Sequence, residues 1–367
     1  MSSLTSGGGG QLASTGHHPE AHAGQIGAVL DLDTLKAKYN FVRKLRKCIY
    51  GDVYAAVARD TDSLVAIKKI SVPFVISMKE NLRLGTPVNS RLKEDWLREL
   101  MVMRDIQKSG GHPYIISLLD DFEVPDLGYF MVFEFCDGGE LFDRMETVGW
   151  SQEEALVDVF NILSAVARIH SLGYAHCDLS LENFMYSSVG HESNQASVRI
   201  IDFGGAQRAS PGDRLTYPDR DVQGHSGIGK VFYKSPRNVQ GLDFDAHKND
   251  VWSCGITLFM LMTGIPPWNV ALEGGDRIFK EWIRGERYFR ELMADWANIE
   301  GPDFDPSRPP CPDYNLRFTP VVWDLLIHML DIDENKRYTA EQALAHECFA
   351  SLVHPSAQLS EESAART

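Results

Sequence analysis

The apolar pattern of this 367-residue chain changes character near residue 137. Before that point, apolar residues occur in short runs rich in β-branched and aromatic side chains, a composition typical of strands. These runs are YNFVRKLRK, DVYAAVAR, SLVAIKKI, IISLLDDFE and YFMVFEF. One stretch of helical pattern, RLKEDWLRELMVMRDIQ, interrupts them. The first part of the chain therefore predicts a small sheet with one main helix.

Helical signals dominate after residue 137. An apolar stripe of helical spacing comprises Leu156, Val159, Phe160, Leu163, Val166 and Ala167. Helix-capping signals occur at Ser151 with Glu154, at Thr319 with Pro320, and at Thr339 with Gln342. We expect an α+β protein with a β-rich lobe at residues 35–135 and a larger, mainly helical lobe at residues 137–352. Ligands favour the crevice between two such lobes.

The two ends of the chain lack the apolar side chains that a core needs. Residues 1–34 are rich in Gly, Ser and His, and residues 353–367 are polar, so neither segment can offset the entropy cost of ordering. We expect a disordered N-terminal tail and a flexible C-terminal tail. Three histidines of the first tail, His17, His18 and His22, are compatible with metal binding, but the composition favours an incidental cluster.

The net charge and the cysteine pattern limit the classes of function that this chain can have. The chain has 36 basic and 51 acidic residues, a formal net charge of -15, which argues against a nucleic-acid partner or an anionic membrane surface. Its six cysteines show no CxxC pairing, and the N-terminus does not resemble a signal peptide, so we expect reduced thiols. The longest apolar run, GITLFMLMTGIPPW, is too short to cross a bilayer. We predict a cytoplasmic protein and make no prediction about its oligomeric state.

Residues suited to phosphoryl-transfer chemistry are spread over both parts. In VAIK, Ala66 and Lys68 lie on one face of a strand, because side chains alternate along a strand, so a cation projects beside a small residue. A buried ammonium needs a partner, and Glu99 lies on the expected helix. Asp202 follows a strand in IIDFGG and suits Mg²⁺, as does Asn183. Asp178 then remains to accept the proton of an incoming hydroxyl.

Each of these signals is weak alone, but their order is specific. VAIK, the acidic helix, HCDLSLEN and DFG follow one another as in the protein-kinase signature set. Over residues 37–350 the chain resembles a eukaryotic protein kinase of the Ser/Thr type, loosely of the calmodulin-dependent group. GKVFYKSPR resembles the end of an activation segment, the segment around Asp250 a central helix, and the segment around Arg337 the closing helix. The resemblance implies a bilobal fold, ATP and Mg²⁺ as cofactors, and a protein substrate.

The resemblance also implies an adenine site and a column of apolar side chains. The third residue of VFEF, Glu134, and Cys136 belong to the hinge whose backbone binds adenine, and Phe133 is the gatekeeper. Further cofactor-binding residues are Leu45, Gly51, Val53, Ala66, Lys68 and Met185. The column that links the lobes in active kinases corresponds to Met103, Leu118, His176 and Phe203, although ordinary core packing also explains these residue types.

Several residues depart from the family pattern. Gly51 is the third glycine of the Gly-rich loop, but Arg46 and Cys48 replace the other two, which hinders close approach of the backbone to phosphates. Cys177 replaces an Arg that reads a phosphate on the activation segment. Phosphorylation there, at Thr216, Tyr217 or Ser226, would lack that switch.

A charge is inverted at the end of the activation segment. Arg237 replaces the Glu of the APE motif, which in the family pairs with the Arg that is Arg337 here. Two cations cannot form that bridge, so we expect a nearby acid, Asp331 or Asp333, to serve instead.

Two further residues are exchanged in the catalytic loop. In the family, a Lys two residues after the catalytic Asp contacts the transferred phosphate and lies against a Thr. Here Ser180 occupies the Lys position and Lys230 the Thr position. We expect the long side chain of Lys230 to deliver the missing cation beside Asp178. The alternative is a solvent-facing Lys230 and a Ser180 that only fills space.

These residues support two functions. The first is an active Ser/Thr protein kinase, with Lys68, Glu99, Asp178 and Lys230 in catalysis and with Asn183 and Asp202 on the metal. The alternative is a pseudokinase, a scaffold that acts through nucleotide or protein binding.

Two smaller predictions concern residues at the edge of the expected site. Glu140 and Glu182 match positions that contact basic residues upstream of the acceptor, although Glu140 also suits a helix cap. Cys48 is expected near the nucleotide, with Arg46 and Lys47 favouring its thiolate, although an unreactive strand cysteine is equally compatible.

Overall fold

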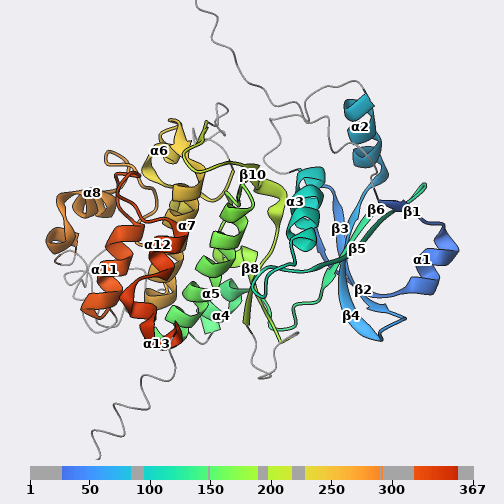
Figure 1. Ribbon diagram of the computed structural model, residues 1–367, viewed down its shortest axis with the longest axis horizontal. Coiled ribbons are helices and arrows are strands. Elements are labelled where there is room, and N and C mark those ends of the chain that lie inside the picture. The colour runs from blue at the N-terminus through green and yellow to red at the C-terminus, as the bar shows by residue number, and fades with distance from the viewer. Residues whose placement is uncertain are drawn as a thin grey trace, which may run out of the picture.

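The computed structural model describes residues 27–83, 95–147, 149–188, 197–216, 228–289, 291 and 318–353. A sheet-rich lobe and a mainly helical lobe lie side by side (Figure 1). The predicted α+β bilobal fold is therefore confirmed. The change in apolar pattern near residue 137 coincides with the passage from one lobe to the other.

The small lobe is built on a six-stranded sheet. Its order is β1-β5-β6-β4-β3-β2, and all pairs are antiparallel except β1 with β5. The strands are β1 (Ala28–Val29), β2 (Tyr39–Lys47), β3 (Gly51–Ala58), β4 (Ser63–Ile70), β5 (Leu118–Val124) and β6 (Gly128–Glu134). On β4, Val65 and Ile67 are buried on one face, while Ala66 and Lys68 lie on the other. This alternation points the predicted cation toward the second lobe.

The expected boundary of the N-terminal tail, at residue 34, is too late. Strand β1 pairs with β5, and helix α1 (Leu32–Lys38) begins after Asp31, whose side chain accepts a hydrogen bond from the Thr34 N–H. Leu35 is buried in the cluster on the outer face of the sheet, and Leu30 packs against it. The packing of these two leucines and the helix cap give residues 28–34 a defined structure, although their composition predicted a tail. The three tail histidines lie outside the described residues.

The small lobe contains more helix than the one predicted. Helix α3 (Trp96–Lys108) is the expected helix, begins after the capping residue Asp95, and lies between the sheet and the helical lobe (Figure 1). Helix α2 (Val72–Arg83) precedes it and was not predicted. Its buried residues Val75 and Met78, three positions apart, anchor it to the core. A two-residue anchor is a short apolar signal, which explains why the sequence pattern did not reveal the helix.

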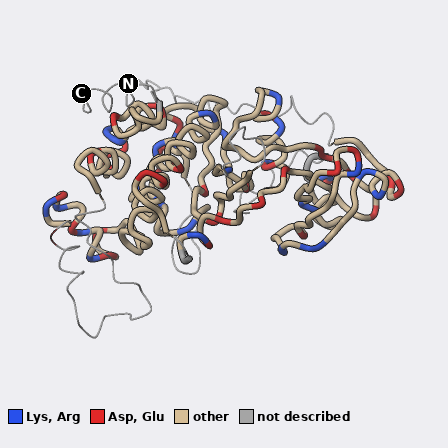
Figure 2. The backbone as a smooth tube through the Cα atoms, turned by 90° about the horizontal axis from the view of Figure 1, so that it is seen from below, with Lys and Arg blue, Asp and Glu red and all other residues tan. Residues whose placement is uncertain are grey.

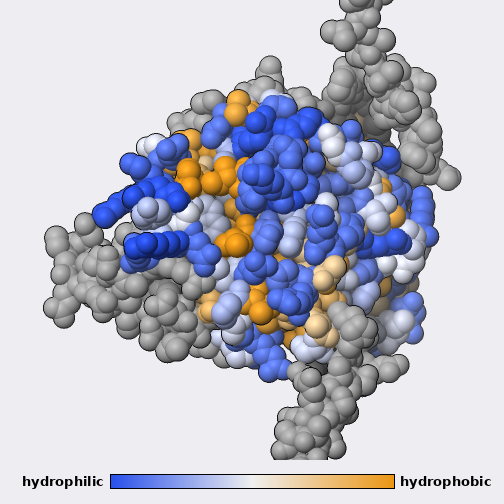
Figure 3. All heavy atoms as spheres, turned by 60° about the vertical axis from the view of Figure 1, so that its left-hand side comes forward, coloured by the Kyte–Doolittle hydropathy of each residue, from blue (hydrophilic) through white to orange (hydrophobic). Residues whose placement is uncertain are grey.

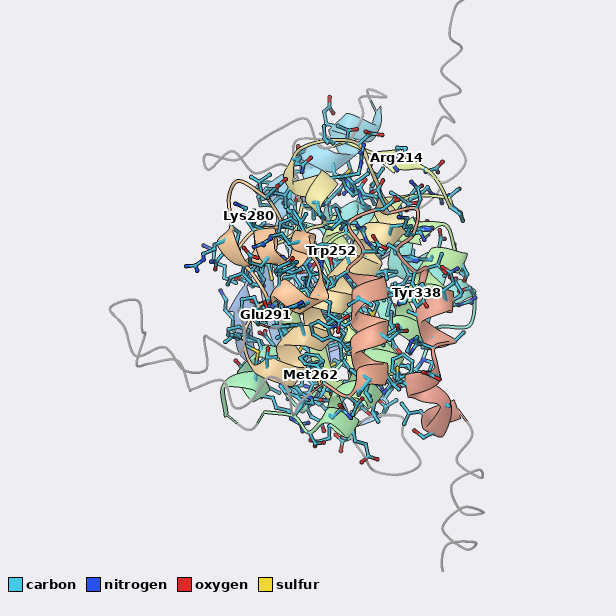
Figure 4. All side chains as sticks on the ribbon, turned by 90° about the vertical axis from the view of Figure 1, so that its left-hand side faces the viewer. Arg214, Trp252, Met262, Lys280, Glu291 and Tyr338 are labelled. Carbon is cyan, nitrogen blue, oxygen red and sulfur yellow. The ribbon has the colours of Figure 1, made fainter. Side chains whose placement is uncertain are left out.

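The large lobe is organised around helix α7 (Ala246–Thr263), which is buried along nearly its whole length. Trp252 of this helix lies near the centre of the lobe in Figure 4. The remaining helices are α4 (Leu141–Thr147), α5 (Gln152–Ser171), α6 (Pro236–Val239), α8 (Arg277–Arg284), α11 (Pro320–Met329), α12 (Ala340–Leu344) and α13 (Ala350–Val353). The predicted capping boxes open α5 and α12, and Thr319–Pro320 opens α11. These predictions are confirmed.

Short strands and single helical turns carry the segments that face the small lobe. The strands are β7 (Tyr174–Ala175), β8 (Phe184–Ser187), β9 (Ser197–Ile200), β10 (Gln207–Arg208), β11 (Arg214–Leu215) and β12 (Phe244–Asp245). The turns are η1 (Leu181–Asn183), η2 (Phe203–Gly205), η3 (Val231–Tyr233) and η4 (Glu347–Phe349). Strands β8 and β9 form a hairpin, and β7 and β11 pair with β10 and β12. The catalytic-loop motif therefore lies between β7 and β8.

The surface carries charges of both signs. Acidic and basic residues are interspersed over both lobes (Figure 2), and the face of the helical lobe in Figure 3 is mostly hydrophilic with smaller apolar areas. In the part of the chain that the structure describes, no helix is both long and apolar enough to span a bilayer.

Candidate active site

A cavity of about 460 Å³ lies between the lobes, within the size range of small-molecule sites. Ten of the predicted residues line it: Leu45, Val53, Ala66, Lys68, Glu99, Phe133, Glu134, Cys136, Met185 and Asp202. A larger groove of about 1080 Å³ lies on the outer side of the hinge. It contains neither Lys68 nor Asp202, so the smaller cavity is the candidate active site.

Lys68 and Glu99 meet at the inner end of this cavity. The Lys68 Nζ lies 2.5 Å from the Glu99 Oε2 and 3.7 Å from the Asp202 Oδ1. The Glu99 side chain is buried, and that of Lys68 is 12% exposed. Burial opposes the charged ammonium, but the two carboxylates outweigh it and raise the pKa of Lys68 above its ordinary value. Lys68 is therefore a fixed cation, suited to bind phosphate oxygens.

Asp202 is held ionised beside this cation. It adopts a left-handed backbone conformation with φ of 61°, and its Oδ1 accepts a hydrogen bond of 3.4 Å from the Gly204 N–H. Burial would raise the pKa of Asp202, but Lys68 and Arg46 lower it below the ordinary value. A carboxylate of this kind is a ligand that Mg²⁺ prefers.

Asn183 provides a second oxygen of the same type. Its amide nitrogen donates to the Asp178 carbonyl at 2.8 Å, which orients the side chain within the catalytic loop. Among the described residues, no three His, Cys, Asp or Glu side chains converge on a metal position. A carboxylate and an amide oxygen nevertheless fit Mg²⁺, because this ion is commonly held by one or two protein oxygens together with phosphates and waters.

Asp250 on α7 holds the catalytic-loop motif in place through hydrogen bonds. The Asp250 carboxylate accepts hydrogen bonds from the His176 N–H at 2.7 Å and from the Cys177 N–H at 2.9 Å, and it contacts His170 at 3.0 Å. Cys177 has a φ of 65°, a strained conformation for a residue with a side chain. The bonds to buried Asp250 maintain this conformation directly before Asp178.

Lys230 lies beside Ser180, as the exchange of the two residues predicts. The Lys230 Nζ is 3.4 Å from the Ser180 Oγ and forms an ion pair with Glu182. Gly229 makes this approach possible, because it has a φ of 85° and an added Cβ would lie 3.0 Å from the Cys177 carbonyl oxygen. The Lys230 side chain is 41% exposed, so its stem has room to move along the catalytic loop.

The predicted site residues that are not among those lining the cavity are Gly51, Asp178, Asn183 and Lys230. An added Cβ at Gly51 would lie 1.9 Å from the Lys69 carbonyl oxygen. Glycine is therefore required by the close packing of β3 against β4, where a side chain would collide with backbone. Arg46 of the Gly-rich loop does line the cavity, and its contact with Glu140 was not predicted.

Cys48 lies near the phosphate end of the cavity, but its thiol is not activated. The Cys48 N–H donates to the Gly51 carbonyl at 2.7 Å in the tight turn between β2 and β3. Burial raises the pKa of the thiol, and the opposing effects of Lys68 and Arg46 do not offset it. The expectation that neighbouring cations favour the thiolate is therefore wrong, because desolvation of this half-buried group is the larger effect.

Arg46 connects the two lobes across the mouth of the cavity. Its Nη1 lies 3.6 Å from the Oε1 of Glu140, a residue that pairs with Met185 in the large lobe. Glu140 therefore does not act only as a helix cap. Both carboxylates predicted to bind substrate cations, Glu140 and Glu182, face a cation of the chain itself.

The adenine end of the cavity is apolar. Phe133 and Cys136 are buried, and burial raises the pKa of the Cys136 thiol to about 12, so it remains neutral. The Glu134 side chain turns away from this end, because its Oε1 accepts from the Ser117 N–H at 2.9 Å and from the Arg199 Nε at 3.3 Å. The Glu134 N–H also has a partner within the chain, since it donates to the Ser117 carbonyl at 3.1 Å. Arg199, which orients the Glu134 side chain, was not predicted.

The four residues of the predicted column are buried. Met103, Leu118 and Phe203 belong to the main core, and the His176 ring lies edge-on to Phe203 with a centroid distance of 4.8 Å. The imidazole of His176 also contacts the Ile201 carbonyl at 3.2 Å. This arrangement keeps Phe203 inside the core and Asp202 in the cavity.

The bridge at the end of the activation segment uses Glu334, in place of the expected Asp331 or Asp333. The Glu334 carboxylate, which is largely buried, pairs with Arg214 and lies 3.5 Å from the Arg237 Nε. Arg214 lies at the edge of the helical lobe in Figure 4. The charge inversion at residue 237 indicated that an acid was needed, but only the tertiary contacts identify it.

Arg337 does not use a carboxylate. Its Nε donates to the Asp331 carbonyl at 2.9 Å, its Nη1 donates to the Lys248 carbonyl at 3.1 Å, and its guanidinium lies 4.8 Å from the centre of the Trp252 ring. Burial lowers the pKa of Arg337 to about 10. The cation is therefore satisfied by backbone oxygens and an aromatic face.

Cys177 belongs to an apolar cluster where the family has a phosphate-reading Arg. The cluster comprises Ala175, Cys177, Ala209, Phe244 and Ala246, with Leu215 packed against it. Leu215 belongs to the activation segment, so apolar packing holds this part of the segment against the catalytic loop. Of the predicted phosphorylation sites, Thr216 is described and exposed, whereas Tyr217 and Ser226 lie outside the described residues.

A nucleotide-sized cavity with a Lys–Glu pair and an Asp beside that pair defines a phosphotransferase of the protein kinase class. Comparison with protein families agrees, since the protein kinase domain family matches residues 39–349. The chain belongs to the protein kinase family. Its resemblance to eukaryotic Ser/Thr kinases is thereby confirmed.

Plant kinases are among the similar curated proteins. The chain is 30% identical over 325 residues to calcium-dependent protein kinase 10 of Oryza sativa subsp. japonica, an alignment that covers 88% of this chain and 45% of the relative. It is 29% identical to calcium-dependent protein kinase 32 of Arabidopsis thaliana, with 85% and 48% covered. The chain thus spans about half the length of these relatives.

Proposed function

We propose that this protein is a Ser/Thr protein kinase that transfers the γ-phosphoryl group of ATP to hydroxyl groups of protein substrates. One observation carries the proposal. Lys68, Glu99 and Asp202 form a connected charge network at one end of a cavity whose other end is apolar and buried. A nucleotide requires this combination, with cations and metal ligands for its phosphates and an apolar slot for its base.

Residues of this chain have separate roles in phosphate binding, metal binding and proton transfer. Lys68, oriented by Glu99, holds the α- and β-phosphates, while Asp202 and Asn183 are the residues that would hold Mg²⁺. Mg²⁺ held there would supply positive charge that neutralises the negative charge developing during transfer. Asp178, on the loop bound to Asp250, orients the acceptor hydroxyl and takes its proton. As the new bond forms between the acceptor oxygen and the γ-phosphorus, the bond from that phosphorus to the β–γ bridging oxygen breaks and ADP leaves.

Lys230 supplies the remaining cation. Its ammonium group lies beside Ser180 and Glu182, at the edge of the catalytic loop. From there, rotation of the exposed stem brings the charge toward Asp178 and the transferred phosphoryl group. A preorganised cation at that point stabilises the transition state.

The substrate is a protein with a basic residue upstream of the acceptor. Glu140 and Glu182 lie on the large-lobe side of the cleft and provide carboxylates for charge-assisted hydrogen bonds to Arg. Reduced cysteines, an acidic net charge and the absence of a membrane-spanning pattern in the sequence support a cytoplasmic location.

The test is incorporation of labelled phosphate into a basic protein substrate with Mg²⁺ and ATP. We expect activity in the parent and a loss of at least about 10²-fold in Asp202→Ala, because the metal loses a carboxylate ligand. The control is Asp126→Ala, which changes an Asp in the exposed turn between β5 and β6. A parent that binds nucleotide without transferring phosphate would instead support the scaffold function.

A further inference from the structure

Arg46 occupies an unusual position for a large cation. It lies on β2 of the small lobe and reaches Glu140 of the large lobe, so the pair closes the mouth of the cavity from one lobe to the other. The pair is loose, with 3.6 Å between Nη1 and Oε1, and its side chains are 45% and 29% exposed. A half-exposed ion pair of this kind is weak, and it breaks readily when either partner finds a better contact.

The guanidinium also lies within reach of the phosphate end of the cavity. Arg46 lines the same cavity as Lys68 and Asp202. An Arg carries a planar fork of donors that binds phosphate oxygens in pairs, more strongly than it binds one carboxylate oxygen at 3.6 Å. Bound phosphates therefore compete with Glu140 for Arg46.

Glu140 has a corresponding choice of partners. Burial raises the pKa of its carboxyl and Arg46 lowers it, while Asp143 and Glu182 add negative charge nearby. If Arg46 leaves, this carboxylate loses its ion-pair partner and keeps only the weaker effect of Lys230. A basic side chain of a substrate then restores the lost charge pairing.

We propose that Arg46 is a specificity-determining side chain with two positions. Without nucleotide it pairs with Glu140 and blocks the contact with a basic substrate residue. With nucleotide it binds the phosphates and releases Glu140 to that residue. The proposal rests on the nucleotide and substrate sites of the proposed function, and it predicts that nucleotide and basic substrate each strengthen binding of the other, because coupling between two sites is reciprocal.

The test measures binding, so it does not depend on turnover. Fluorescence anisotropy gives the Kd of two labelled peptides that differ only in Arg or Ala upstream of the acceptor, with and without Mg²⁺ and a non-hydrolysable ATP analogue. In the parent, we expect the analogue to tighten the Arg peptide about three- to fivefold, the range for one exposed ion pair, and to leave the Ala peptide unchanged.

The variants assign this coupling to one side chain. Arg46→Met keeps the apolar stem, and we expect it to bind the Arg peptide equally well with and without the analogue, with the affinity of the nucleotide-bound parent. Lys47→Met removes the same charge from the adjacent, exposed position on β2 and should keep the coupling. In Glu140→Gln the Arg peptide should lose its advantage over the Ala peptide in both states.

Three outcomes overturn the proposal. These are a parent without coupling, coupling that persists in Arg46→Met, and coupling that Lys47→Met also abolishes. Direct titration of the analogue by calorimetry separates this failure from that of the proposed function. A parent that does not bind nucleotide contradicts both, whereas a parent that binds nucleotide without coupling contradicts only the role of Arg46.

Discussion

Single side chains replace groups that the family places elsewhere in the catalytic loop. The Lys230 ammonium lies 3.4 Å from Ser180, whose position normally carries the cation. We expect Lys230→Ala to lower kcat about 10²–10³-fold, because a preorganised cation near the transferred group is lost. The Ser180→Lys/Lys230→Thr double variant should recover much of this loss, since the two residues are coupled.

Steady-state kinetics of the three variants, Lys230→Ala, Ser180→Lys and the double variant, test this exchange. If kcat of Lys230→Ala stays within about threefold of the parent, which is less than ~0.7 kcal/mol of barrier, the idea is wrong. The ion pair with Glu182 would then be the main role of Lys230.

Cys48 reports on nucleotide binding without strong intrinsic reactivity. Its thiol lies half-buried in the turn between β2 and β3, and burial raises its pKa above the ordinary value. Alkylation should therefore be slow at pH 7 and should accelerate as the pH rises toward the raised pKa, because the thiolate is the nucleophile.

Nucleotide should protect this thiol. Mass spectrometry after iodoacetamide treatment gives the rate, with Cys348, which lies in the closing segment η4, as the internal control. Equal rates at Cys48 with and without Mg-ATP would contradict the location of this thiol beside the phosphates.

At the scale of elements, Glu334 fastens the activation segment to the large lobe. It joins Arg214 on β11 and Arg237 on α6, and Asp243 contacts both of these cations from outside. Glu334→Gln leaves two neighbouring guanidinium groups without their largely buried counter-ion. We expect a loss of about 1–3 kcal/mol in the free energy of unfolding, below the full cost of a buried pair because both arginines are partly exposed.

The matched control removes the repulsion from one side. Arg237→Glu alone places a carboxylate against Glu334 and should destabilise, whereas Arg237→Glu/Glu334→Gln removes the facing carboxylate and should recover part of the stability. Urea unfolding measures each variant. A double variant no more stable than the sum of the two single changes would show that the bridge does not couple them.

At the scale of the whole molecule, His112 makes stability depend on pH where the two lobes meet. It follows α3, its Nδ1 accepts from the Tyr114 N–H at 3.3 Å, and its Nε2 contacts Ser164 of α5 at 3.3 Å. Burial, with Arg168 and Arg199, lowers the pKa of His112 to about 4. In the unfolded chain the pKa is about 6.5.

The difference between these two pKa values sets the direction in which stability changes with pH. The unfolded state binds the proton more tightly, so the contribution of His112 is complete above about pH 6.5 and is lost as the pH falls toward 4. We expect the parent to lose about 1–2 kcal/mol more than His112→Asn between pH 7 and pH 5, after allowance for partial exposure. Urea unfolding at the two pH values measures this, and equal losses in both proteins would contradict it.

Strand faces and helix starts could be predicted from the amino-acid sequence, because each depends on residues close together in the chain. Alternation along β4 placed Ala66 and Lys68 on one face, and residues 151 and 154 capped α5, because these relations involve positions a few residues apart. The need of a buried ammonium for a partner predicted the Lys68–Glu99 pair. The resemblance to kinases added the exchange of Ser180 with Lys230, since motif order carries that information.

Which side chains far apart in the sequence come into contact depends on the tertiary structure. The contacts of Arg46 with Glu140 and of Glu334 with Arg237 join segments that are far apart in the chain, and no local pattern specifies them. The direction of the pKa shift of the Cys48 thiol also depends on the folded chain. Its sequence neighbours are cations, but burial is the larger effect and raises the pKa. Desolvation and long-range pairing depend on how the lobes pack, and packing is a property of the folded chain.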